Sequence, residues 1–254
     1  MDVLEVLADS PMRAKELADL LEIKWTTAYR TLAYLGDNGY LKRDGATGNY
    51  YIGSRLYYIG SAYVAHLPIL QVSRPYLKAA AEETGATVQL VERDGYRSVV
   101  LNVFEPSSDY IPKTTIGYHF PLHCGSKGHV LLAYAGPDFI EEYLSHPLEV
   151  LTPYTITDPD GLRECLAEVR AQEYAVTVRD VQVSTASIAA PVRDSSGGVI
   201  ASVCLIVTYA EFEQARPKLV DVAVNTARSI SQLMGWRPAL GAQRRAVVER
   251  PAST

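Results

Sequence analysis

The sequence predicts an α+β protein with an N-terminal winged helix-turn-helix, a linker helix and a C-terminal α/β domain built on an antiparallel sheet. Three observations predict this fold. Three short segments with helical spacing precede two short alternating strands, a separate amphipathic helix follows them, and helical and alternating segments then succeed one another. A length of 254 residues with 48% hydrophobic residues is sufficient to fill two cores.

The N-terminal pattern is helix, helix, helix, hairpin. Apolar spacing predicts a first helix that ends at Ser10-Pro11 and a second from Lys15 to Leu21. The stretch KWTTAYRTLAYLGDNGY, residues 24–40, predicts the third, with Leu32 on its inward stripe and Gly39 ending it in the left-handed conformation. Strands at 40–43 and 50–52, with a turn at 44–49, complete a winged helix-turn-helix over residues 1–54.

Charge is unevenly distributed in this domain. Residues 1–22 hold six acidic and two basic side chains, a net charge of −4, whereas residues 23–55 hold five basic and two acidic ones, a net charge of +3. The third helix of such a domain enters the major groove and the hairpin lies along the backbone. The predicted DNA-contacting residues are Trp25, Thr26, Thr27, Tyr29, Arg30, Lys42 and Arg43.

Each of these residues has an expected role. Arg30 is suited to guanine O6 and N7, the two threonines to phosphates or bases, and Lys42 and Arg43 to phosphate oxygens. Trp25 and Tyr29 either pack on the sugar-phosphate chain or cover the domain's own core. An alternative is a winged helix used only for protein contacts, with Arg30 a solvated charge.

A linker helix is predicted within residues 55–70, ending before Pro68. Its three tyrosines and its apolar stripe indicate a surface on which two subunits meet; the alternative is a helix packed on its own domain.

The C-terminal domain is predicted over residues 71–236. We expect helices at 72–84, 126–135, 157–173 and 211–234, a hairpin of strands 87–93 and 98–104 around Asp94-Gly95, and strands 188–193 and 199–208 joined by residues 194–198. Residues 237–254 have no apolar period and are predicted to be a disordered tail.

The motifs KWTTAYRTLAYLGDNGYLKRD, NYYIGSRLYYIG, GYHFPLHCGSKGHVLLAY and EYAVTVRDVQVSTASIAAPVRDSSGGVIASVCL together resemble the IclR family of bacterial transcriptional regulators, from Val3 to Trp236. The resemblance implies a GAF-like effector domain, homodimers that pair as dimers of dimers, and a palindromic operator. It also implies a small organic acid as effector. The implied effector-binding residues are Ser126, Lys127, Thr177, Ser187, Cys204 and Ile206, with His123 and Arg179 as further candidates.

Two features refine this site. Free backbone N–H groups at the helix start, at Ser126 and Lys127, suit a carboxylate. Members of the family that bind very small keto acids carry an acidic residue near Thr177 and serines near Cys204 and Ile206. The less polar side chains here favour a larger, aromatic acid.

A metal-responsive regulator is the alternative function, because His119, His123, Cys124 and His129 lie within eleven residues. Pro121 interrupts any single helix that would align the first two histidines. A hydrolase that uses Cys124 with His123 is disfavoured, because adjacent strand residues point to opposite faces. The chain has no phosphate loop, nucleophile elbow or paired carboxylates, so neither an enzyme nor a cofactor is expected.

Composition bounds the setting. There is no run of about 18 apolar residues and no signal-peptide pattern, so we expect a cytoplasmic protein without a membrane partner. Three widely spaced cysteines, Cys124, Cys165 and Cys204, are expected to be buried, reduced thiols. The net charge of −5 does not indicate a chain that binds nucleic acid over its whole surface.

Overall fold

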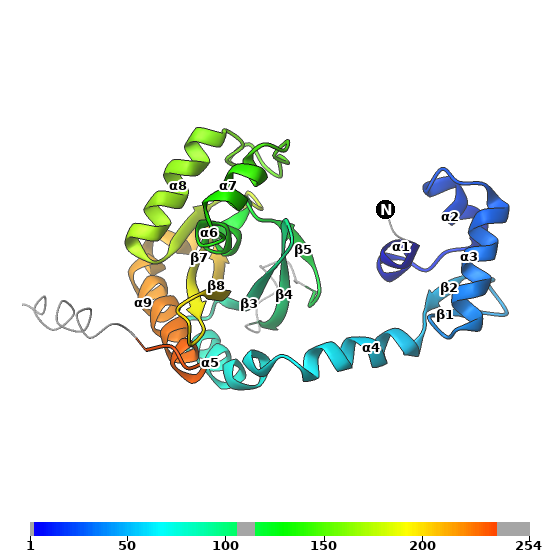
Figure 1. Cartoon of the computed structure of the whole chain (residues 1–254), viewed down its shortest axis with the longest axis horizontal. Helices are drawn as coiled ribbons and strands as arrows, with labels where there is room; N and C mark the ends of the chain where they lie inside the picture. The colour runs from blue at the N-terminus through cyan, green and yellow to red at the C-terminus, as the bar shows by residue number, and fades with distance from the viewer. Residues whose placement is uncertain (1–2, 106–114, 238–254) are drawn as a thin grey trace, which may run out of the picture. The chain divides into compact units, whose positions relative to one another are not determined.

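The computed structural model describes residues 3–105 and 115–237, and the chain forms two compact units, Met1–Pro68 and Ile69–Thr254 (Figure 1). The predicted α+β class is confirmed. The boundary between the units falls inside the predicted linker segment 55–70. The predicted disordered tail, apart from Arg237, lies outside the described residues. Of the helices in the described ranges, none has the length and apolar character needed to cross a bilayer.

The first unit consists of α1 (Val3–Asp9), α2 (Ala14–Leu20), α3 (Trp25–Asp37), β1 (Leu41–Arg43), β2 (Tyr50–Ile52) and α4 (Ser54–Ala65). The three-helix part and the hairpin share one core, made of Val6, Leu7, Leu17, Leu32, Leu41 and Tyr50. The Tyr50 N–H donates to the Met12 carbonyl at 2.9 Å, which joins the hairpin to the segment between α1 and α2. A small core therefore sets the position of α3 relative to the wing, β1–β2.

The junction between α3 and the wing requires two glycines. Gly39 has a φ of +75°, and the Tyr40 N–H reaches back to the Leu35 carbonyl at 2.9 Å, so the helix ends as predicted. At Gly53, a Cβ would overlap the Gly39 carbonyl oxygen and lie 2.8 Å from the Tyr40 carbonyl carbon. The start of α4 can therefore approach the end of α3 only because residue 53 has no side chain.

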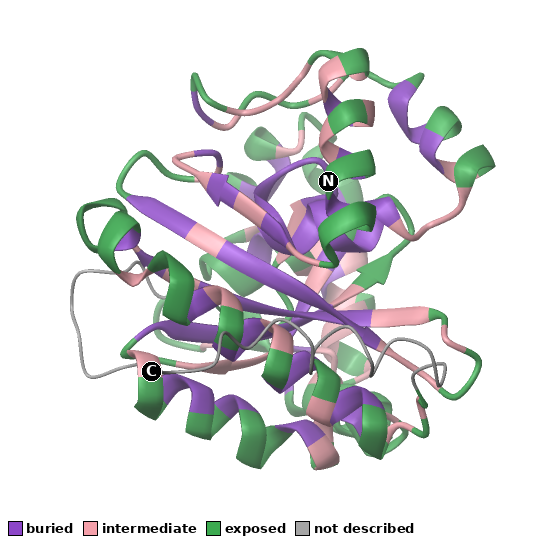
Figure 2. Ribbon diagram, turned by 90° about the vertical axis from the view of Figure 1, so that its left-hand side faces the viewer, coloured by how far each residue is buried: buried purple, intermediate pink, exposed green. Residues whose placement is uncertain are grey.

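The second unit is built on a six-stranded, fully antiparallel sheet in the order β5-β4-β3-β8-β7-β6. Its strands are β3 (Thr87–Asp94), β4 (Arg97–Phe104), β5 (His119–Pro121), β6 (Ala175–Val178), β7 (Thr185–Arg193) and β8 (Val199–Thr208). Its helices are α5 (Pro68–Thr84), α6 (Gly125–Ala133), α7 (Pro137–Leu144), α8 (Pro159–Gln172) and α9 (Tyr209–Leu233). Strands β7 and β8 are mostly buried, and Figure 2 shows long buried stretches along the sheet.

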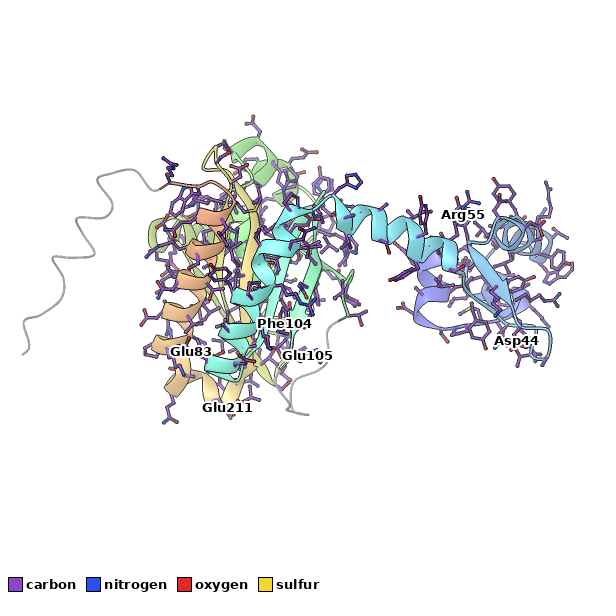
Figure 3. All side chains as sticks on the ribbon, turned by 90° about the horizontal axis from the view of Figure 1, so that it is seen from below. Asp44, Arg55, Glu83, Phe104, Glu105 and Glu211 are labelled. Carbon is purple, nitrogen blue, oxygen red and sulfur yellow. The ribbon has the colours of Figure 1, made fainter. Side chains whose placement is uncertain are left out.

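Helices cover both faces of this sheet. α6, α7 and α8 lie on one face and α5 and α9 on the other (Figure 1). Lys218 on α9 donates to the carbonyl of Glu83 at the end of α5, at 2.6 Å (Figure 3). All residues of α6 are buried, and a Cβ at Gly128 would overlap the Leu122 carbonyl oxygen. α6 is therefore the central helix of the unit, pressed against the loop that precedes it.

Two elements were not predicted. β5 has three residues and ends in a proline, so it shows no measurable alternation. α7 has only eight residues, and Pro137 at its start follows Gly136 with a φ of +94°, a pair that also indicates a loop. β6, which has four residues, was implied only by the family resemblance.

Candidate functional sites

The N-terminal half of α3 is the most exposed part of that helix. Ala28 and Leu32 are fully buried, which turns Trp25, Thr26, Thr27, Tyr29 and Arg30 toward solvent. We call these five exposed residues the α3 face. Trp25 and Tyr29 are 53% and 43% exposed and stack on one another with ring centroids 5.4 Å apart. Neither therefore covers the domain's own core, which removes one of the two expected roles.

Arg30 is free to contact a ligand. It is exposed and has no hydrogen bond, ion pair or ring contact with any residue in the described ranges. The threonine hydroxyls beside it are exposed as well. A flexible guanidinium next to small hydroxylated side chains can reach into a groove lined by acceptors.

The wing has a well-defined turn with a cationic strand beside it. Lys42 and Arg43 are exposed on β1. In the turn, Asp44 Oδ1 accepts from the backbone N–H groups of Ala46 and Thr47 at 2.6 and 3.0 Å (Figure 3). These bonds, that of Thr47 first, lower the pKa of Asp44. Arg13 Nε donates to the Thr47 carbonyl at 2.8 Å, so α2 supports the tip.

One of the five basic residues within 23–55, Arg55, has a structural role instead. Arg55 donates to the Asn38 carbonyl at 3.0 Å and lies over the Tyr40 ring at 4.9 Å (Figure 3). It joins the start of α4 to the end of α3, so its charge is less available to a ligand than those of Lys42 and Arg43.

A cavity of about 290 Å³ opens in the second unit. Five of the six predicted effector residues line it, namely Lys127, Thr177, Ser187, Cys204 and Ile206, with Thr115, Tyr118, Phe120, Gly125, Asp180, Val181, Gln182, Thr185 and Ala186. The sixth, Ser126, lies directly behind it, with its Oγ 2.7 Å from Ser187 Oγ. The structure therefore brings all six together, although four of them are more than fifty residues from Ser126 in the sequence.

The polar atoms at the base of the cavity already satisfy one another. Thr177 Oγ1 lies 2.9 Å from Ser187 Oγ and accepts from the Ser126 N–H at 3.0 Å. The Gly125 N–H donates to Asp180 Oδ2 at 2.6 Å. The expectation of a free Ser126 N–H at the helix start was wrong, because Thr177 on β6 occupies it.

Lys127 is a buried cation in this cavity. Lys127 is 3% exposed. Its Nζ donates to Gln89 Oε1 at 3.1 Å and lies 3.6 Å from the centre of the Phe120 ring. Burial lowers the pKa of Lys127 to about 8. No carboxylate forms an ion pair with it among the described residues.

Asp180 lies in the loop between β6 and β7 and is 4% exposed. Thr152 and Thr155 Oγ1 donate to its backbone carbonyl at 3.1 and 2.9 Å, which anchors the loop. His129 Nε2 is 4.0 Å from Oδ2. Asp180 Oδ1 is buried and has no hydrogen-bond partner. Burial raises the pKa of Asp180, because the ionised form loses its hydration.

The four candidate metal ligands do not form a site. Both His123 ring nitrogens have partners, Tyr143 Oη at 2.7 Å and the Glu149 carbonyl at 2.9 Å. His129 Nε2 donates to the His123 carbonyl at 2.8 Å, and His119 pairs with Asp94 at 3.2 Å. Residues 3–105 and 115–237 contain no group of three or more His, Cys, Asp or Glu that could hold a metal ion.

The remaining candidates have structural partners too. Cys165 Sγ lies 3.4 Å from His129 Nδ1, and burial raises the pKa of Cys165 to about 11, so the thiol donates to a neutral imidazole. All three cysteines are free. Cys124 and Cys204 are buried, as expected, whereas Cys165 is only half-buried. Arg179 donates to the Val183 carbonyl at 3.2 Å and lies 4.4 Å from the centre of the Tyr154 ring.

Sequence reasoning missed Asp180, Gln89 and Phe120. Asp180 follows a short strand in a loop without periodicity, and only its contact with Gly125, 55 positions earlier, places it in the cavity. No local pattern in the sequence singles it out.

Comparison with known proteins identifies the family and the fold. The family described as "Bacterial transcriptional regulator IclR C-terminal" matches residues 61–232. The DNA-binding transcriptional repressor YiaJ of Escherichia coli K12 is 27% identical over 94% of this chain and 88% of its own length. Two crystal structures share the fold at 24% identity. The IclR homologue of Microbacterium hydrocarbonoxydans, complexed with 4-hydroxybenzoate, has a TM-score of 0.79 (91% and 95% of the two chains), and the regulator of Alicyclobacillus acidocaldarius one of 0.78 (89% and 91%).

Proposed function

Because the chain belongs to the IclR family of bacterial transcriptional regulators, we propose that it binds operator DNA through the α3 face and the wing and responds to a small aromatic acid held in the cavity. Two observations support this proposal: among the described residues, the exposed Arg30 has no partner and the buried Lys127 forms no ion pair. The protein acts in the cytoplasm as a regulator and not as an enzyme.

On DNA, the α3 face enters the major groove. Arg30 donates two hydrogen bonds to guanine, and the threonine hydroxyls contact bases or phosphates. Lys42 and Arg43 neutralise phosphates beside the groove, and the stacked Trp25–Tyr29 pair packs on the sugar-phosphate chain. This division assigns sequence reading to α3 and general affinity to the wing.

Two copies bind a palindromic operator. Within the first unit α4 buries none of its residues, and Tyr57 and Tyr58 are 81% and 74% exposed. Aromatic side chains on an unpartnered helix are typical of subunit interfaces. We infer that α4 pairs with its copy and that the dimers associate in pairs. Sedimentation of a Tyr57→Ser/Tyr58→Ser variant at lower mass than the natural chain would support this, and unchanged mass would contradict it.

The effector is an aromatic organic acid. Phe120, Val181 and Ile206 give the cavity apolar walls around the Lys127 ammonium. The 4-hydroxybenzoate found in a protein of the same fold supports this ligand class. The effector shifts the balance between two arrangements of the readers, and the shift equals its difference in affinity for them.

The test begins with the full chain and a pool of random DNA duplexes. Bound duplexes are amplified over several rounds and sequenced. We expect an enriched palindrome whose half-sites are about one or two helical turns apart. Operator affinity is then measured with and without benzoate, hydroxybenzoates and pyruvate.

Two results would contradict the proposal. One is the absence of any enriched sequence, which would favour the protein-contact alternative for the winged helix. The other is an operator affinity that responds to pyruvate and to no aromatic acid.

A further inference from the structure

The second unit also contains an open groove that plays no part in the proposed function. It has a volume of about 510 Å³ and is lined by residues of α6, α7 and α8, three helices on the same face of the sheet (Figure 1). Ala133 and Tyr134, at the C-terminal end of α6, belong to its lining. Gly125 and Lys127, at the N-terminal end of the same helix, line the cavity described above. The groove and the cavity are therefore separate, at opposite ends of α6.

The base of the groove is apolar. Pro137 and Ile140 come from one side of α7, and Leu166 comes from the facing side of α8. Ile140 and Leu166 are buried, so they form a firm floor beneath the opening. An apolar group that lies on this floor releases water from apolar surface, which favours binding.

The two arginines that line the groove differ in their partners. Arg163 is held by two carboxylates: its Nε and Nη2 donate to Glu141 at 3.0 and 2.6 Å, and its Nη1 donates to Asp160 at 2.7 Å. Arg170 donates to the uncharged Ala133 carbonyl at 3.2 Å and forms no ion pair with a carboxylate of the described residues. Its guanidinium keeps further N–H donors in a planar fork, the geometry that suits a carboxylate. One end of the groove is therefore neutralised, and the other end offers a cation.

The spacing of these arginines limits the ligand. They are seven residues apart on α8, which is about 10 Å along a helix axis. A short chain whose carboxylate lies at Arg170 ends over the apolar floor. A second carboxylate at the far end would approach Glu141 and Asp160 without gaining a cation, because Arg163 already has two anionic partners. The groove therefore suits a single negative charge on a short apolar body.

We propose that the groove lined by α6, α7 and α8 binds a short aliphatic monocarboxylate, whose carboxylate pairs with Arg170 and whose chain lies over Ile140 and Leu166. This site is separate from the cavity that contains Lys127, and the inference does not depend on the proposed function. A ligand in the groove and a ligand in the cavity contact opposite ends of one buried helix, α6.

Methyl NMR spectra of the full chain, with isotope-labelled isoleucine methyl groups, test the site directly. Ile140 lines the groove and Ile206 lines the cavity, so their signals report on the two places separately. Each signal is assigned with an Ile→Val variant. The probes are hexanoate, its neutral amide, hexylamine and adipate, which carries a second carboxylate. We expect hexanoate at millimolar concentration to shift the Ile140 signal, and the other three to bind more weakly at this position.

Arginine variants test the charged contact. Arg170 is exposed, so Arg170→Met is expected to fold, and it should weaken the binding that moves the Ile140 signal by about 10-fold. Arg170→Lys, which keeps the charge, should lose less affinity. Arg228→Met, at an exposed position on α9, is the matched control and should bind like the natural chain. Lys127→Met should leave the Ile140 shift in place, even if hexanoate also enters the cavity and moves the Ile206 signal.

Several results would overturn the inference. Hexanoate that moves only the Ile206 signal binds in the cavity and not in the groove. Equal affinity in Arg170→Met and the natural chain removes the charged contact, and adipate that binds as tightly as hexanoate removes the argument for a single charge. The circular dichroism spectrum and melting temperature of each variant show that a loss of binding is not a loss of folding.

Discussion

The α3 face of the first unit and the cavity of the second place their cations in opposite surroundings. Arg30 and Lys42 are exposed, so their charges are hydrated and cost the fold little. Lys127 is 3% exposed and forms no ion pair within the described part of the chain, so its charge opposes folding. The difference shows two ways to prepare a binding group. A surface cation is available at any time, whereas a buried cation opposes folding until a bound anion neutralises it.

The largest expected effect is a loss of stability of the first unit alone. Gly53→Ala forces a Cβ into the Gly39 and Tyr40 carbonyls, and we expect it to lower the free energy of unfolding of the first unit by about 3 kcal/mol. Ligand affinity of the second unit should not change. Fluorescence of Trp25 in a Trp236→Phe background reports on the first unit alone.

Gly36→Ala is the matched control, since nothing lies within 4 Å of the added carbon. It should not lose stability. If Gly53→Ala lowered the free energy of unfolding of both units equally, the two units would not unfold independently.

The next effect concerns DNA. Arg30→Ala should weaken operator binding by about 1–3 kcal/mol and relax the preference at one base position. Lys42→Ala should weaken binding to all sequences alike and reduce the slope of log affinity against log salt by about 1. Arg228→Ala, an exposed arginine on α9, is the control. Unchanged operator affinity in Arg30→Ala would show that α3 does not read the groove.

Lys127→Met tests how much the buried charge costs the stability of the second unit. Replacing a buried, unpaired cation by an apolar chain of similar length should raise the free energy of unfolding by about 1–2 kcal/mol while ligand affinity falls. Lys42→Met on the surface should change stability by less than about 0.5 kcal/mol. Urea denaturation measures both. A loss of stability in Lys127→Met would mean that Lys127 is a structural residue.

The same residue predicts a pH dependence. Its pKa is about 8 in the folded chain and higher in the unfolded one, so between these values the unfolded state binds more protons. The penalty that the buried Lys127 charge imposes on stability is therefore fully present below about pH 8 and is relieved as the pH rises above that value. Burial raises the pKa values of the neighbouring thiols Cys124 and Cys204. The difference in stability between the natural chain and Lys127→Met should shrink from pH 7 to pH 9.5.

The smallest effect is on α4. Gly60 is exposed in a helix interior with open space around it, so Gly60→Ala should stabilise the first unit by up to about 1 kcal/mol. If α4 forms a dimer interface at this position, the added methyl group will also change the dimer dissociation constant. Sedimentation and thermal unfolding distinguish the two effects.

The two units differ in how much of their structure could be predicted from the sequence. α3 and the wing follow from local features: the buried Ala28 and Leu32 at helical spacing, Gly39 at the helix end and the Asp44 turn. In the second unit the long helices and the two hairpins were predicted as well. β5 and α7 were not, because three residues and eight residues carry too little periodic pattern.

The cavity was predicted less completely. The family resemblance brought together residues that no local pattern connects, and the structure gathers them around one cavity; their role in binding an effector stays a prediction. Asp180 and the loss of the free Ser126 N–H could not be foreseen, because both depend on contacts across more than fifty residues.

The closed set of hydroxyls behind the cavity has a consequence for how the protein can evolve. Ser126, Thr177 and Ser187 each depend on another member for a hydrogen bond. An apolar substitution at one of them leaves a buried polar group without a partner, which lowers the free energy of unfolding by about 1–3 kcal/mol. A new ligand preference that passes through these positions therefore needs paired substitutions. Lys127 lies outside this set, and its ammonium donates one hydrogen bond, to Gln89. We expect a single mutation there to shift the ligand preference from an acid to a neutral compound.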